Sequence, residues 1–162
     1  MILGISTAAF TQLHVIISLI GIAAGLLALL GMLGGKFYRL LTALFLITTV
    51  LTSVTGFLFP FHGMTPGIIL GILSMIALVV AIWALYMGKL EGSWRGTYII
   101  TSSLALWFNF FVLIAQSFAK IPALKAIAPT QASPAFGITQ GVVLLVFLLL
   151  TIRAFKKFHP AA

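Results

Sequence analysis

Residues 11–33 read TQLHVIISLIGIAAGLLALLGML, a stretch that contains no charged side chain. As an α-helix rising about 1.5 Å per residue, it is long enough to cross the roughly 30 Å hydrocarbon core of a bilayer. A bilayer core holds no water for unsatisfied backbone groups, and the stretch is a continuous apolar run without strict alternation. A helix is therefore favoured over a strand of a barrel.

The chain contains four more stretches of the same kind, at residues 40–59, 67–88, 97–118 and 137–155. With 62% hydrophobic and 6% charged residues, a soluble fold of 162 residues could not bury enough apolar surface. The sequence predicts an all-α polytopic membrane bundle of five transmembrane helices, forming one integral membrane domain over residues 1–162. The pairs Thr65-Pro66 and Ser133-Pro134 mark the starts of the third and fifth spans, and the proline-broken stretch 119–136 is predicted to be a loop.

The lysines and arginines lie beside the spans rather than in one patch, which argues against nucleic-acid binding. Seven fall at one predicted end of the bundle and two at the other: Lys36, Arg39, Lys89, Arg95, Arg153, Lys156 and Lys157, against Lys120 and Lys125. Because basic residues favour the cytoplasmic side of a membrane, the N-terminus is expected outside and the C-terminus inside.

The chain has no cysteine, and Glu91 is its one acidic residue. These absences exclude thiolate chemistry, paired-carboxylate catalysis and an acidic proton relay. No motif of a known catalyst is present, so a non-enzymatic protein is the preferred interpretation.

Polar side chains inside the predicted spans are biased toward the outer half. Counting residues from the centre of each span puts Asn109 near the midplane and the other polar groups outward of it. The hypothesis is an outward-facing pocket for a hydrophobic or amphipathic ligand or a partner membrane subunit. Its candidate residues are His14, Thr52, Thr55, His62, Asn109, Gln116 and Gln140. The competing interpretation is structural hydrogen bonding between helices and ordinary polarity near helix ends.

Two histidines expected on the same side of the membrane, His14 and His62, leave open a redox subunit that binds haem b or a quinone. The aromatic run 107–111 would supply stacking surfaces for such a cofactor. Two histidines without a nearby carboxylate or thiolate make a poor dedicated metal site. A small channel or transporter is a further alternative, although no mid-span proline or paired-glycine break indicates a transport site.

Small residues recur at helical spacing on the first and third spans. Gly21 and Gly25 share a face with His14 and are expected to pack inward, or to form contacts with a second copy of the chain. The first two hairpins also share a histidine, a GxxxG motif and a Gly-Lys turn, which leaves an internal duplication open.

The segments 13–25 and 55–62, followed by Thr65-Pro66, resemble an uncharacterised family of small, multi-pass bacterial inner-membrane proteins. The resemblance extends over most of the chain. It implies a bacterial inner membrane and a stand-alone helical bundle, and it brings no functional residues.

Overall fold

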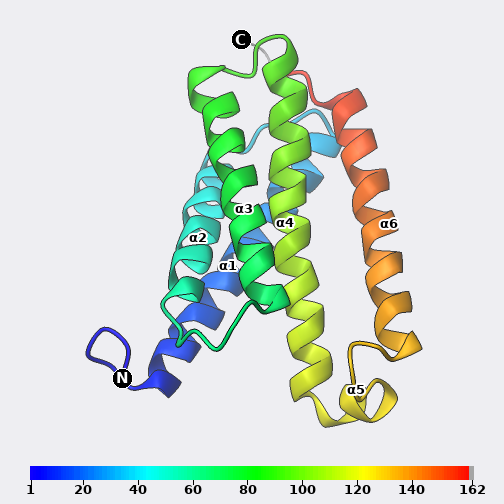
Figure 1. Ribbon diagram of the computed structural model, residues 1–162. Helices are drawn as coiled ribbons and strands as arrows, with labels where there is room; N and C mark the ends of the chain where they lie inside the picture. The colour runs from blue at the N-terminus through cyan, green and yellow to red at the C-terminus, as the bar shows by residue number, and fades with distance from the viewer. Residues whose placement is uncertain (161–162) are drawn as a thin grey trace.

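A computed structural model describes residues 1–160 and shows a bundle of long helices (Figure 1). Within those residues, five helical segments are long and apolar enough to cross a membrane. They are α1 (Thr7–Leu33), α2 (Arg39–Phe57), α3 (Pro66–Ile82) continued by the π-helical turn η1 (Trp83–Met87), α4 (Ser93–Lys120) and α6 (Pro134–Lys157). The predicted fold class, an all-α membrane bundle of five spans, is confirmed.

The proline signals mark helix starts as predicted. Thr65 caps α3 by accepting a hydrogen bond from the backbone N–H of Ile68 at 3.3 Å, and α6 begins at Pro134 behind Ser133. The connection predicted as a loop contains a short helix, α5 (Pro122–Ile127). Proline is favourable at the first position of a helix, so Pro122 breaks α4 and also begins α5.

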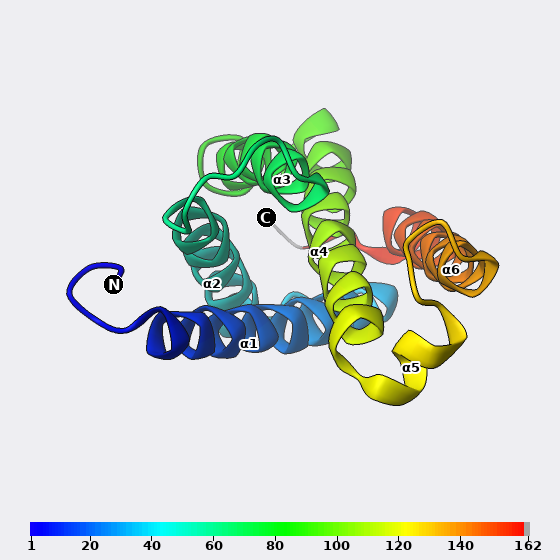
Figure 2. The same cartoon turned by 60° about the horizontal axis from the view of Figure 1, so that its bottom comes forward.

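Helices α1 to α4 form a ring, as the view from the lower end in Figure 2 shows. Around the ring, α1 contacts α2, α2 contacts α3, α3 contacts α4, and α4 contacts α1. Helix α6 lies outside the ring against α4 and α1 (Figures 1 and 2). The four helices therefore enclose an interior space in which a ligand site can form.

Glycines permit the close approach of α1 to its neighbours. A Cβ atom placed on Gly25 would lie 2.6 Å from the Phe45 ring of α2 and 2.8 Å from Leu106 of α4, and one on Gly21 would lie 2.8 Å from Thr48 Oγ1. The inward orientation expected for these two glycines is confirmed. Their GxxxG face is used inside the chain, so it is not available for contact with a second copy.

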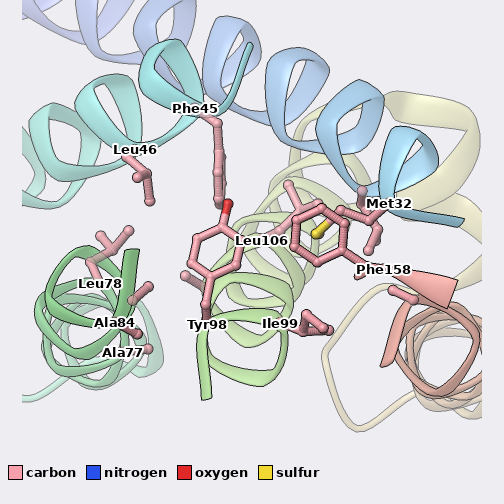
Figure 3. Packing of buried hydrophobic residues seen from close by; sticks show 14 of the residues in the cluster. Met32, Phe45, Leu46, Ala77, Leu78, Ala84, Tyr98, Ile99, Leu106 and Phe158 are labelled. Atoms are coloured by element: carbon pink, nitrogen blue, oxygen red, sulfur yellow. The ribbon is translucent and has the colours of Figure 1, made fainter. Parts of the chain in front are cut away.

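The hydrophobic core fills the half of the ring nearer the C-terminus. Figure 3 shows Tyr98 among side chains of α2, α3 and α4, with Phe158 close to Met32. Tyr98 and Phe158 are almost completely buried. All seven cations assigned to one side by sequence lie in segments at this end of the bundle, whereas Lys120 and Lys125 belong to the opposite end (Figure 1).

The C-terminal end of α6 is held by Arg95, near the start of α4. The guanidinium donates hydrogen bonds to the carbonyl oxygens of Phe155 and Phe158, each at 2.8 Å, and lies 5.0 Å from the centre of the Phe155 ring. The last carbonyls of a helix have no partner within the helix, so these bonds satisfy groups that would otherwise lack a donor.

Candidate functional site

A cavity of about 710 Å³ occupies the half of the ring that the core leaves unfilled. It lies between the N-terminal halves of α1 and α3 and the C-terminal halves of α2 and α4, and the α2–α3 loop borders it. A volume between about 300 and 1,000 Å³ is typical of sites for small molecules. Its polar lining residues are Thr11, His14, Ser18, Thr52, Ser53, His62, Thr65, Ser74, Asn109, Gln116, Ser117 and Lys120.

The remaining wall is apolar. It is formed by Val15, Leu19, Ile22, Gly56, Phe57, Phe59, Pro60, Phe61, Gly67, Ile68, Leu70, Gly71, Phe108, Val112, Leu113 and Ile121. Along α4, the cavity extends from Asn109 to Lys120, a rise of about 16 Å at 1.5 Å per residue. The cavity is thus a deep, mostly apolar space with polar groups at its floor and its mouth.

His14 is held in one orientation by α2 and the α2–α3 loop. Its Nδ1 lies 2.8 Å from Thr55 Oγ1, and its ring meets the Phe59 ring edge to face, with 5.3 Å between ring centres. Thr55 Oγ1 also lies 2.7 Å from the carbonyl oxygen of Leu51, which can only accept. The single hydroxyl hydrogen of Thr55 is therefore donated to Leu51, and His14 Nδ1–H donates to Thr55. In the neutral imidazole, this arrangement leaves Nε2 as an acceptor.

Two buried polar groups at the cavity floor lack partners. Asn109 Nδ2 and Ser74 Oγ are inaccessible to solvent and make no hydrogen bond with the described residues. A buried polar group without a partner costs about 1–3 kcal/mol. Both residues line the cavity, but these two atoms have no accessible surface in this conformation, so each side chain would have to rotate to bring its donor to a bound acceptor group.

Several other hydroxyls in the cavity are already engaged as donors. Thr52, Ser18 and Ser117 each donate to a carbonyl four residues earlier in their own helix, at 2.8, 2.7 and 2.7 Å. Such back-bonding uses the hydroxyl hydrogen and leaves only lone pairs for a ligand. Among the lining residues, seven side chains donate no hydrogen bond to the described residues: Ser53, His62, Thr65, Ser74, Asn109, Gln116 and Lys120.

The mouth of the cavity carries positive charge. Among the described residues, Lys120 is the one lysine or arginine that lines the cavity, and His62 of the α2–α3 loop also lines it. The sole acidic residue, Glu91, lies between η1 and α4 at the opposite end of the bundle. No carboxylate side chain therefore neutralises Lys120 within the site.

The structure brings five of the seven sequence-predicted residues to the cavity: His14, Thr52, His62, Asn109 and Gln116. Thr55 lies behind His14 and orients it rather than lining the space. Gln140 does not line the cavity; its Nε2 donates to the carbonyl oxygen of Phe111 at 3.0 Å. Gln140 therefore forms a hydrogen bond between α6 and α4, as the competing interpretation of structural hydrogen bonding expects.

The aromatic run 107–111 does not form a stacking platform in the cavity. Of its four aromatic residues, Phe108 lines the space. Phe110 packs edge to face against Phe147 of α6, and Phe111 does so against Phe136 of the same helix, with ring centres 5.1 and 6.2 Å apart. A run of consecutive aromatics points in several directions around a helix, so its members divide between cavity and helix contacts.

Sequence reasoning missed Ser74 and Lys120 as lining residues. Ser74 belongs to a seam of small residues on α3, and Lys120 was interpreted only as a topological charge. The spacing of Leu113, Gln116, Ser117 and Lys120 places all four on one face of α4. That periodicity is the signal in the sequence that identifies Lys120.

Within residues 1–160, no three histidine or acidic side chains gather where they could hold a metal ion. Comparison of the chain with protein-family models, curated proteins and solved structures finds no match. The cavity and its chemistry are therefore the basis for a functional interpretation.

Proposed function

We propose that this protein is a non-enzymatic membrane protein that binds a small amphipathic ligand in the cavity between α1, α2, α3 and α4. The observation that carries the proposal is a mostly apolar cavity lined by several polar side chains that make no hydrogen bond with the described residues, Asn109 and Gln116 among them. An apolar pocket with a few converging polar groups is the usual form of a ligand site. The proposed location is a bacterial inner membrane, with the cavity facing outward.

Replacing Asn109 separates ligand binding from stability. Asn109→Leu removes no hydrogen bond to the described residues, so its thermal stability in detergent should equal or exceed that of the wild type. The ligand recovered by solvent extraction and mass spectrometry should fall sharply.

Gln140→Leu is the matched control because Gln140 is also a buried amide but lies outside the cavity. It loses its bond to the Phe111 carbonyl, so the free energy of unfolding should fall by about 1 kcal/mol while the ligand is retained. Asn109→Leu that loses stability and keeps its ligand would contradict the proposal.

A second candidate is a redox subunit with haem b or a quinone. It is favoured by His14 and His62 lining the same cavity and by the Nδ1–H bond of His14 to Thr55, which leaves Nε2 free. Metal-bound histidines commonly donate their other ring N–H to a fixed acceptor. A Soret band in the purified protein that disappears in His14→Ala would support haem, whereas a colourless preparation would oppose it.

A further inference from the structure

The position of Lys120 restricts the head group that the cavity can accept. Lys120 is the last residue of α4 and lines the cavity, as does His62 of the α2–α3 loop. No acidic side chain of the described residues lines the cavity. An anionic head group at the mouth would gain the attraction of the ammonium group without displacing a carboxylate.

The cavity also has room and surface for a chain. Between Lys120 and Asn109, its α4 wall includes Val112 and Leu113, and its α1 wall includes Leu19. The volume of about 710 Å³ lies in the range that suits one drug-sized molecule. A lipid with a single acyl chain fits this class better than a complete phospholipid with two chains.

Part of α1 that borders the cavity is not covered by α4 (Figures 1 and 2). Helices α1 and α4 approach at Gly25 and Leu106 and separate toward the lower end, as Figures 1 and 2 show. Ile22, close to this crossing, is 8% exposed. Val15 and Leu19, farther down α1, line the cavity and are nevertheless 41% and 47% exposed. An acyl chain in the surrounding bilayer would reach the cavity along this uncovered part of α1.

From these observations, and resting on the proposed function, we infer that the ligand is a single-chain acidic lipid taken from the bilayer. Its anionic head group lies at Lys120, and its acyl chain lies against the apolar wall that includes Leu19, Val112 and Leu113. Lys120 matches the anionic head group, and the apolar wall matches the acyl chain. The part of α1 that α4 does not cover matches entry from the bilayer.

The test uses oleate and oleyl alcohol, which share one acyl chain and differ in head-group charge. Delipidated protein in neutral detergent is titrated with each, and binding is followed by displacement of a fluorescent fatty acid. The wild type should prefer oleate, and Lys120→Gln should weaken oleate binding by about fivefold or more, since one lysine contributes about 1 kcal/mol toward an anionic lipid. Binding of oleyl alcohol should change little.

Lys125→Gln is the matched control, because Lys125 lies at the same end of the bundle, in α5, and does not line the cavity. It should leave oleate binding unchanged. Acetate, which has the head group without a chain, should not compete.

The binding results distinguish an acidic-lipid site from a site for any amphiphile. Binding of neither oleate nor oleyl alcohol would oppose an amphiphile site altogether. If the wild type binds oleate and oleyl alcohol equally, the preference for an acidic lipid is contradicted. The same holds if Lys120→Gln and Lys125→Gln have equal effects on oleate binding. The cavity would then be a site for a neutral amphiphile. Competition by acetate would indicate a site for a free anion.

Discussion

His14 is the residue whose chemistry the fold defines most closely. Thr55 accepts from its Nδ1, and the Thr55 hydrogen is already donated to Leu51. The sequence places histidine and threonine at similar depth, but it cannot show that two helices bring them within 2.8 Å. The tautomer is thus a property of the tertiary structure and is measurable.

We expect neutral His14 to carry its hydrogen on Nδ1. Nuclear magnetic resonance of protein labelled with ¹⁵N-histidine distinguishes the two ring nitrogens, and His62→Ala and His159→Ala assign the signals. Thr55→Val, which removes the acceptor, should abolish the preference. A wild-type protein whose neutral His14 carries the hydrogen on Nε2 would show that the His14–Thr55 contact is misassigned.

At the scale of single elements, close approach of α1 to α2 and α4 depends on Gly25. Gly25→Ala would place a methyl group 2.6 Å from the Phe45 ring, and Phe45 is only 3% exposed and has little room to move. Overpacking of this kind typically lowers the free energy of unfolding by about 1–3 kcal/mol.

Gly137→Ala provides the control for this substitution. Gly137 lies in α6 with open space where its Cβ would be, so stability should be unchanged or should rise by up to about 1 kcal/mol through helix propensity. Unfolding in detergent measures both variants. Equal stability of the two would contradict the close contact at Gly25.

The end of α6 depends in the same way on Arg95. Arg95→Gln removes charge-assisted bonds to two carbonyls, which should loosen the last turn of α6 by about 2 kcal/mol. Hydrogen exchange in residues 153–158 should then accelerate about thirtyfold. Arg153→Gln, at an exposed position on the same helix, should leave the exchange rate near that of the wild type.

At the scale of the whole molecule, the bundle has a filled half and a hollow half. The core and seven cations lie at one end, while the cavity lies at the other. We propose that the filled end faces the cytoplasm, because basic residues are retained on that side.

The natural absence of cysteine allows a clean test of this orientation. Gln131→Cys, in the α5–α6 connection, should react with an impermeant thiol reagent in intact cells. Ser93→Cys, at the start of α4 near the other end, should react only after permeabilisation. The reverse pattern of labelling would show the opposite orientation, with the cavity on the cytoplasmic side.

The sequence predicts the membrane class, the five spans and the inward face of α1, because these depend on local hydropathy and helical spacing. It also predicts polar residues in one half of the bundle. It does not distinguish Asn109, which lines the cavity, from Gln140, which binds a backbone carbonyl of α4. Both are amides in apolar spans, and only the placement of α6 outside the ring separates them.

Photo-crosslinking with a diazirine-bearing fatty acid reports where the ligand lies in the bundle. We expect crosslinks, competed by unlabelled oleate, to cavity-lining residues of α1 and α4 such as Leu19, Val112 and Leu113. Lys120→Gln should reduce them, and Lys125→Gln should not. Crosslinks confined to the exposed face of α6, at residues such as Leu145 and Leu149, or labelling that oleate does not displace, would contradict a ligand site inside the bundle.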